Sequence, residues 1–364
     1  MRVMNSGTAQ YAKRFAGQAA DGHFRKAQDM LVSSLGIGTY LGRPDVQTDK
    51  RYTAAVVAAI ESGINVIDTA INYRFQRSER SVGAALQQLA QRGISRDELV
   101  LCTKGGYLAP DGAMPAEPNR YFFREYIQPG VFSSKDIAAG GHCMTSGFLA
   151  NQLERSLRNL GVAWVDVYYL HNPETQLQEI SKPDFLERLH QAFDYLESAA
   201  QAGKIRYYGV ATWNGLRQRA GTRDALQLGE LAQVARDIAG QSHRFRFVQL
   251  PFNLAMTEAL TLGNQSIGGN HKTVMEAAAE LGITLVASAS LLQGQVARNL
   301  PPLVASALGL QDDVERAVQF VRSSPGSTTA LVGMSRVAHV RAIARLVSVP
   351  PASVEQFGRL FTHG

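Results

Sequence analysis

Cysteine is scarce in this chain, which contains two among its 364 residues, Cys102 and Cys143. Two cysteines cannot build a disulfide framework, and neither of them has partners at the spacing of a zinc site. The sequence therefore predicts no bound metal and a reducing, cytoplasmic compartment.

Long apolar runs and charge clusters are also missing. No stretch approaches the roughly 20 apolar residues of a membrane span, and the N-terminus lacks the apolar region of a secretory signal. The 37 Lys and Arg residues outnumber the 31 Asp and Glu residues, but they are scattered along the chain. We therefore expect no membrane and no nucleic-acid partner, although this basic balance suits a ligand that carries phosphate.

What the chain does contain is a recurring signature of amphipathic helix, glycine and apolar strand. The signature recurs at 62–69, 160–171, 202–212 and 281–290, and further strands fit at 35–39, 99–104, 247–251 and 329–333. Near-continuous apolar strands are typical of parallel sheets that are covered on both faces. The alternation favours an α/β fold of the (β/α)8 TIM-barrel type, with an open doubly wound sheet as the alternative.

Helical patterns lie between these strands. The expected helices cover 50–61, 78–91, 147–159, 183–201, 272–281, 312–322 and 337–347. Ser146 is a plausible N-cap for the helix at 147–159. Residues 1–24 are expected to form a helical N-terminal extension, and residues 25–364 are expected to form a single barrel domain.

Two long irregular stretches, 105–145 and 253–271, interrupt the alternation. In a barrel, both stretches follow the carboxyl ends of strands and overhang the face where active sites form. The first stretch is rich in aromatic residues. It is interpreted either as a lid over a sizeable or flat substrate, or as a segment that packs on the barrel or mediates contacts between subunits.

Titratable side chains end three neighbouring strands of the expected barrel. These residues are Asp68, Lys104 and His171, and Tyr73 follows Asp68 by five residues. Each one alone has an ordinary explanation, as a helix cap, a solvated strand end or a satisfied core histidine. Together they point to a site, because the strand ends of a barrel converge on one mouth.

This set of side chains suits proton donation by a phenol. A free tyrosine titrates near ~10, and a nearby ammonium lowers that pKa because it favours the phenolate. We expect Lys104 to supply the ammonium and Asp68 to hold it as an ion pair. His171 would then orient the substrate oxygen while Tyr73 protonates it. The remaining requirement is a hydride, which calls for a nicotinamide cofactor.

The motifs around these residues resemble the aldo-keto reductases. They are DTAINY (68–73), LVLCTK (99–104), LHNPE (170–174) and YYGVAT (207–212), and the resemblance runs from roughly Arg25 to His363. It implies a catalytic set of Asp68, Tyr73, Lys104 and His171. It also implies NADPH, or less often NADH, bound across the barrel mouth, and a small-molecule carbonyl substrate.

The resemblance implies further contacts with the cofactor. They are Gly38, Thr39, Asp68, Thr212, Asn214, Gln249, Ser288, Leu291, Gly333, Ser335, Arg336 and His339. Arg336 favours NADPH because a guanidinium pairs with the additional phosphate. Ser288 replaces the family's aromatic residue on the nicotinamide face, which leaves that face less covered unless Trp213 substitutes. Candidate substrate contacts are Tyr40, Tyr107, Phe122 and Trp213.

Two other functions stay open at this level. The chain could be a sensor of the same fold that binds NADP(H) and turns over slowly. It could also be an NAD-dependent sugar or alcohol dehydrogenase. The sequence specifies neither the substrate, nor the direction of the reaction, nor the oligomeric state.

Overall fold

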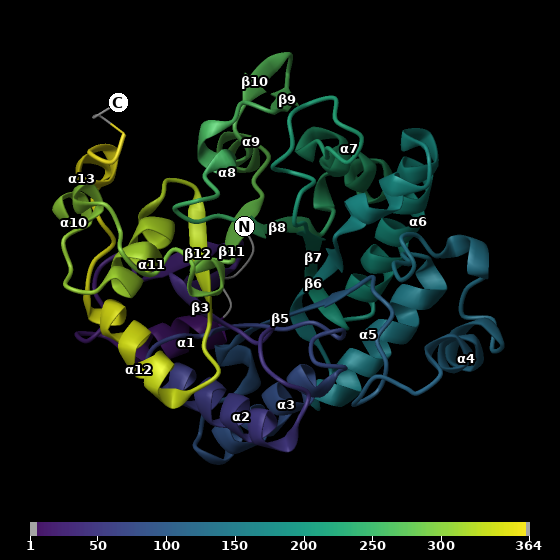
Figure 1. The fold of residues 1–364 in the computed structure, drawn as a ribbon, viewed down its shortest axis with the longest axis horizontal. Coiled ribbons are helices and arrows are strands. Elements are labelled where there is room, and N and C mark those ends of the chain that lie inside the picture. Colours follow the sequence, from purple (N-terminus) through teal and green to yellow (C-terminus); the bar gives the residue numbers. More distant parts are fainter. Residues whose placement is uncertain (1–5, 362–364) are drawn as a thin grey trace.

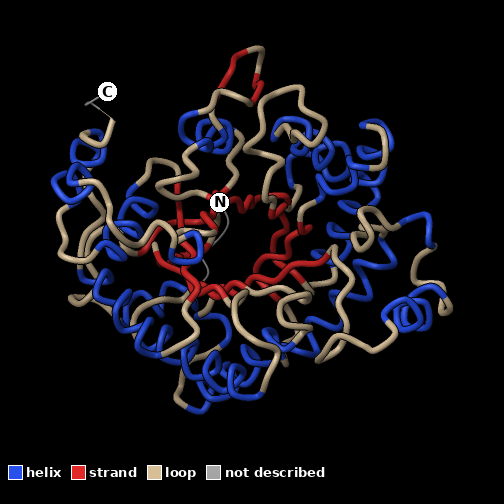
Figure 2. Tube along the Cα trace, in the orientation of Figure 1, coloured by secondary structure: helices blue, strands red, loops and turns tan. Residues whose placement is uncertain are grey.

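Eight parallel strands form a closed barrel in the computed structural model, which describes residues 6–361. The barrel strands, red in Figure 2, are β3 (Leu35–Gly38), β4 (Val66–Asp68), β5 (Val100–Gly105), β6 (Val165–His171), β7 (Ile205–Ala211), β8 (Phe245–Pro251), β11 (Thr284–Ser288) and β12 (Ser327–Gly333). Neighbours in this order pair in parallel, and β12 closes the ring by pairing with β3. The predicted (β/α)8 barrel is confirmed, and the open doubly wound sheet is excluded.

Helices surround the barrel on its outside (Figure 1). The longer ones are α2 (Val46–Glu61), α3 (Arg77–Gln91), α5 (Ser146–Leu160), α6 (Lys182–Gln201), α7 (Leu228–Ala239), α9 (Val274–Glu280), α11 (Asp313–Ser323) and α12 (Val337–Ala344). The sequence analysis did not identify α7. The predicted cap of α5 was wrong by one residue: Thr145 is extended and accepts a hydrogen bond from the Phe148 N–H, whereas Ser146 is already helical.

Residues 6–33 precede the barrel and combine a helix with a hairpin, and residues 1–5 of the predicted extension lie outside the described residues. Helix α1 (Ser6–Arg14) is as predicted, but the antiparallel strands β1 (Phe24–Ala27) and β2 (Met30–Ser33) were not predicted. Ala27, Met30 and Val32 pack against residues of the barrel interior. The hairpin covers the end where the barrel strands begin, since the Ser33 N–H donates to the side chain of Asn65, one residue before β4.

The two long stretches are more structured than the sequence predicts. Residues 105–145 contain α4 (Pro118–Phe122) and a π-helical turn (Phe123–Ile127), and α4 lies outside the barrel beyond α5 (Figure 1). Residues 253–271 contain α8 (Glu258–Thr261), β9 (Gln265–Ile267) and most of β10 (Asn270–Lys272), and the two strands form a protruding hairpin. Two further short helices are α10 (Pro302–Leu308) and α13 (Val354–Gly358).

Candidate active site

Alternation along the barrel strands places the titratable residues on the inside. Side chains two residues apart share one face of a strand, and Val66, Cys102 and Tyr169 all belong to the apolar cluster of the barrel interior. Each of these residues is followed, two positions later, by Asp68, Lys104 or His171 at the end of its strand. The same strand period that builds the core therefore carries these three groups to the mouth of the barrel.

Lys104 connects Asp68 and Tyr73. Its ammonium is 1% exposed and donates to Asp68 Oδ1 at 2.5 Å, to the Thr69 carbonyl oxygen at 2.9 Å and to the Tyr73 hydroxyl at 3.1 Å. The second carboxylate oxygen of Asp68 accepts from Gln249 Nε2 at 2.7 Å. Lys104 therefore has its three donors used, and Asp68 is held from two sides.

Burial and charge oppose one another in this cluster. Burial raises the pKa of Tyr73, and the Lys104 ammonium offsets only part of that rise. Burial alone would lower the pKa of Lys104, but the Asp68 carboxylate and Tyr73 hold it above its usual value. The sequence analysis expected Lys104 to lower the pKa of Tyr73; the direction of its contribution is as expected, but burial outweighs it.

His171 lies beside Tyr73 and is neutral. Burial, aided by the nearby Lys104 ammonium and His142, holds the pKa of His171 well below its usual range. Its ring meets the rings of Tyr73 and Tyr107 edge-on, with centroids 6.0 Å and 5.3 Å apart. The backbone carbonyl of His171 also accepts a hydrogen bond from His142 Nε2 at 2.8 Å.

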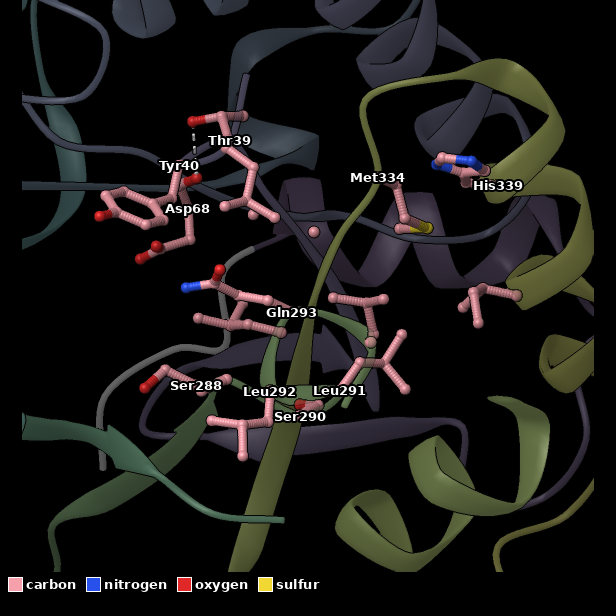
Figure 3. A pocket seen from close by; sticks show the side chains of 18 of the residues that line it. Thr39, Tyr40, Asp68, Ser288, Ser290, Leu291, Leu292, Gln293, Met334 and His339 are labelled. Atoms are coloured by element: carbon pink, nitrogen blue, oxygen red, sulfur yellow. Dashed lines mark hydrogen bonds between the residues drawn. The ribbon is translucent and has the colours of Figure 1, made fainter. Parts of the chain in front are cut away.

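A long cavity opens at this mouth and has a volume of about 840 Å³. Figure 3 shows Thr39, Tyr40 and Asp68 at one side of the cavity and Met334 and His339 at another. The predicted site residues that line it are Gly38, Thr39, Tyr40, Asp68, Tyr73, Tyr107, His171, Thr212, Trp213, Gln249, Ser288, Leu291, Gly333 and His339. The structure therefore brings most of the predicted residues together around one space.

Five predicted residues do not line this cavity, and one of them is Lys104, which contacts the lining residues Asp68 and Tyr73. Phe122 stacks on Tyr126 in the 105–145 segment, outside the cavity, so we no longer assign it to the substrate. Asn214 is next to the cavity, and its backbone N–H points to the buried carboxylate of Glu174. Ser335 and Arg336 line a separate pocket of about 310 Å³, which also contains Arg43 and Arg51.

Two residues of LHNPE were missed as individual site residues. Asn172 lines the cavity in a left-handed conformation, and its Nδ2 donates to the Tyr107 hydroxyl at 3.1 Å. Glu174 Oε1 accepts hydrogen bonds from the Thr212 hydroxyl and from the N–H groups of residues 213, 214 and 215. This carboxylate fixes the turn after β7. The LHNPE motif, which contains Glu174, is the sequence feature from which this role could have been predicted.

The cavity is lined by both polar and apolar side chains. It runs from Asp68 and Tyr73 to the start of α12, and Ser290 places a buried hydroxyl without a protein partner in its wall. Gly333 brings β12 to the cavity without a side chain. Within residues 6–361, no group of three or more His, Cys, Asp and Glu side chains is placed to hold a metal ion. No helix among these residues is long and apolar enough to cross a membrane.

Comparisons with known proteins point to one family. A sequence model of the Aldo/keto reductase family matches residues 34–223. The NADH-specific methylglyoxal reductase of Escherichia coli is 26% identical over 208 residues, which cover 56% of this chain and 54% of that protein. The 6-dehydroglucose reductase of Novosphingobium aromaticivorans is 25% identical over 187 residues, 50% of this chain and 49% of that protein. The chain thus spans about half the length of the curated relatives it matches.

Solved structures resemble the whole barrel. An aldo/keto reductase from Klebsiella pneumoniae in complex with NADP and acetate has a TM-score of 0.62 and 20% identity, with 94% of each chain covered. The holo form of an aldo-keto reductase from Bacillus halodurans has a TM-score of 0.63 and 19% identity, with 93% of this chain and 94% of that chain covered. These similarities establish a shared fold.

Proposed function

Because the chain belongs to the aldo/keto reductase family, we propose that it reduces a small aldehyde or ketone with NADPH. The observation that carries this proposal is the contact of the Tyr73 hydroxyl with Lys104 Nζ, 3.1 Å away, beside the ring of His171. A phenol, an ammonium and an imidazole from separate parts of the chain meet there, beside a cavity of about 840 Å³.

Tyr73 is the general acid in this proposal. A bound nicotinamide cofactor supplies the hydride. Burial raises the pKa of Tyr73, so the phenol stays protonated at neutral pH and retains the proton that the substrate oxygen needs. As that proton leaves, negative charge develops on the phenol oxygen next to the Lys104 ammonium, which stabilises it.

The neighbouring residues orient this transfer. His171 is neutral, so its imidazole carries one N–H, which can donate a hydrogen bond to a substrate carbonyl without adding charge. Asp68 accepts a hydrogen bond from the ammonium of Lys104, and Gln249 donates to the second carboxylate oxygen of Asp68. We therefore assign Tyr73 to proton transfer, His171 to substrate orientation, and Lys104 with Asp68 to charge stabilisation.

The residues proposed to bind the cofactor line the cavity from the catalytic residues toward α12. Gln249, Thr212 and Ser288 lie at its catalytic end, and Gly333 and His339 lie toward its other end. Next to Gly333 along the chain, Ser335 and Arg336 enter the smaller pocket with Arg43 and Arg51. Three guanidiniums around one pocket suit a phosphate, and this supports NADPH over NADH.

The substrate proposed here is an uncharged carbonyl compound that carries an aromatic group. The rings of Tyr40, Tyr107 and Trp213 line the cavity near Tyr73, and Tyr40 and Trp213 are 59% and 45% exposed. Of the described residues that line this end, none besides Asp68 carries a formal charge, and Asp68 is already paired. An aromatic substrate gains contact with these rings, whereas a carboxylate or phosphate group finds no cationic partner there.

Replacing Tyr73 by Phe tests the proton donor. Tyr73→Phe keeps the ring and its contacts with Tyr40 and His171 but removes the hydroxyl. We expect kcat for NADPH-dependent reduction of aromatic aldehydes to fall by about 10²-fold or more. NADPH binding, followed by its fluorescence, should stay unchanged. Retention of most of the activity in Tyr73→Phe would contradict the assignment.

The same assays distinguish the alternatives. Tight NADPH binding without oxidation by any member of a carbonyl panel would support a sensor rather than an enzyme. Faster alcohol oxidation with NAD than carbonyl reduction with NADPH would support a dehydrogenase. The panel should pair aromatic with aliphatic aldehydes of similar size, so that the role of the aromatic walls is tested separately from the reaction.

A further inference from the structure

The turn immediately after Tyr73 has an unfavourable backbone conformation. Arg74, Phe75 and Gln76 have φ values of 49°, 59° and 69°, and α3 begins at the next residue. The left-handed region is costly for residues that carry a Cβ, so three such residues in succession persist only where surrounding contacts hold them. This backbone therefore requires an explanation from the side chains around it.

The guanidinium of Arg74 provides one. Arg74 is 7% exposed, and its Nη2 donates to Asp49 Oδ1 at 2.7 Å and to Ser81 Oγ at 3.1 Å. Its Nε donates to Ser78 Oγ at 3.1 Å, four residues further along the chain. The guanidinium also lies over the ring of Tyr52, 4.9 Å from its centroid. One buried side chain thus joins α2, α3 and the turn behind Tyr73.

Arg74 also supports the opposite wall of the site. Its Nη1 donates to the Arg43 carbonyl oxygen at 3.4 Å, and Tyr52, on which it lies, donates to the Leu41 carbonyl oxygen at 2.6 Å. These carbonyls belong to the segment 39–43, whose Tyr40 ring packs edge-on against Tyr73 at 5.0 Å. Arg74 therefore contacts both the turn that carries Tyr73 and the segment that packs on it.

Gln76 anchors the far end of the turn. Its Nε2 lies 3.3 Å from each of the carbonyl oxygens of Ala109 and Pro110, and its Oε1 accepts from Asn159. Neither Arg74 nor Gln76 lines the cavity, so neither touches a bound substrate or cofactor. Their contacts act on the site only through the backbone that holds Tyr73.

We propose that Arg74 is a positioning residue, whose buried guanidinium fixes the left-handed turn and the segment 39–43 and so holds the Tyr73 hydroxyl beside Lys104. This inference rests on the role proposed above for Tyr73. Small displacements of a reacting group are costly, so loss of Arg74 slows the chemical step. Cofactor affinity should change less than the chemical step, because Arg74 itself lines neither pocket and reaches Thr39 and Arg43 only through the backbone of the segment 39–43.

A set of three substitutions separates the guanidinium from the backbone. Arg74→Ala removes the guanidinium but leaves a Cβ in the left-handed turn, whereas Arg74→Gly also removes the steric penalty. Arg74→Lys keeps a cation facing Asp49. We expect kcat to fall by about 10- to 100-fold in Arg74→Ala, less in Arg74→Gly, and least in Arg74→Lys. The KM for NADPH should change less than kcat in each of the three variants.

Arg77→Ala is the matched control. Arg77 also pairs with Asp49, at 2.5 Å, but it belongs to α3, and its bond to the turn runs from its backbone N–H to the Arg74 carbonyl oxygen, which alanine keeps. Loss of a partly exposed ion pair of this kind has small effects, so kcat should stay within about twofold of the unchanged protein. Equal losses of kcat in Arg77→Ala and Arg74→Ala would overturn the proposal.

Hydrogen exchange supplies a readout that does not depend on turnover. Amides of residues 70–78 and 39–43 should exchange faster in Arg74→Ala than in Arg77→Ala, with the remainder of the barrel unchanged. Unchanged exchange, or faster exchange with an unchanged kcat, would overturn the positioning role. If the unmodified protein shows no turnover that depends on Tyr73, the proposed function fails, while hydrogen exchange still decides whether Arg74 holds the turn. If Arg74→Ala does not fold, Arg74→Lys decides by the same two measurements.

Discussion

Single residues at the barrel mouth act through a balance between burial and charge. Tyr73 is buried, which favours the neutral phenol, and Lys104 lies 3.1 Å away, which favours the phenolate. Burial prevails in this site, so the phenol of Tyr73 keeps its proton at neutral pH. In the proposed reaction, a substrate oxygen accepts that proton and the ammonium stabilises the charge that the transfer creates.

This balance predicts the dependence of reduction on pH. Because the pKa of Tyr73 is raised by burial, its proton is retained up to and beyond the usual value of about 10. We expect kcat for reduction to be constant across neutral pH and to fall only in strongly alkaline solution. Measurement of kcat against pH with a stable aldehyde tests this.

Lys104→Met is the variant to compare with the unchanged protein when kcat is measured against pH. It removes the ammonium that offsets the effect of burial, so the pKa of Tyr73 should rise further while kcat falls by about 10²-fold or more. An alkaline decline of kcat near neutral pH in the unchanged protein would contradict this account of Tyr73.

Among the elements, the segment 105–145 was the hardest to interpret from sequence. Its aromatic residues suggested either a lid or a packed segment, and two of them are buried: Tyr126 and Phe132 form a cluster with Cys143 and Phe148, whereas Phe123 is 51% exposed. Phe148 belongs to α5, so the segment is attached to that helix. At the start of the segment, Tyr107 lines the cavity, and it alone among these aromatic residues does so.

A substitution in this cluster should affect stability but not catalysis. Tyr126 is fully buried, and its ring centroid lies 5.5 Å from that of Phe132 and 5.4 Å from that of Phe148. Tyr126→Ala should cost about 3 to 5 kcal/mol in the free energy of unfolding of this segment. Hydrogen exchange of residues 118–132 measures that cost, and KM for each aldehyde should stay unchanged.

Tyr107→Phe is the comparison for that experiment. It removes the hydroxyl that accepts from Asn172 and contacts Thr175, at the cavity, without creating a void in the cluster. A change of KM in Tyr126→Ala similar to that in Tyr107→Phe would show that the cluster acts as a lid after all.

The molecule as a whole is closed at its base by buried polar groups. The guanidinium of Arg322 is fully buried and donates to the carbonyl oxygens of Leu346 and Val349 and to Ser34 Oγ. Nearby, the His23 ring lies between Ser34 Oγ at 3.1 Å and the Gly63 carbonyl oxygen at 2.8 Å. Since the carbonyl can only accept, His23 Nε2 carries the proton, and the ring is neutral.

This arrangement predicts loss of stability in mild acid. Burial lowers the pKa of His23 to about 4, whereas an unfolded histidine titrates near 6.5. As pH falls, the unfolded chain binds the proton first, so this contribution is complete above about 6.5 and is lost progressively down to about 4. The full difference is about 3 kcal/mol, from 1.36 kcal/mol per pKa unit. Denaturant unfolding between these pH values measures it.

His23→Gln should flatten part of that pH dependence. The remaining slope is expected from His142 and His243, whose pKa values burial also lowers to about 4, and from His171, whose pKa lies well below its usual range. A stability profile with the same slope in His23→Gln as in the unchanged protein would rule out His23 as the responsible group.

The sequence by itself determined the barrel and brought together the residues of the proposed site. Asp68, Lys104 and His171 each end an apolar strand. The period of two along a strand places their side chains on the face that lines the barrel interior. Because the carboxyl ends of the strands meet at one mouth of the barrel, the three side chains are expected to lie close together. Tyr73 belongs with them through local spacing alone. These inferences need only short-range pattern, which a sequence records directly.

Only the tertiary structure decided the properties that depend on long-range contacts. The net shift in the pKa of Tyr73 depends on burial by segments far along the chain, such as the one that carries Tyr40. The bond from Gln249 to Asp68 joins residues 181 positions apart, and no local pattern indicates it. The role of Arg74 likewise follows from a backbone conformation that its residue type disfavours, which surrounding contacts impose. Packing sets these features, since the same residues in another environment would have other neighbours, other burial and other pKa values.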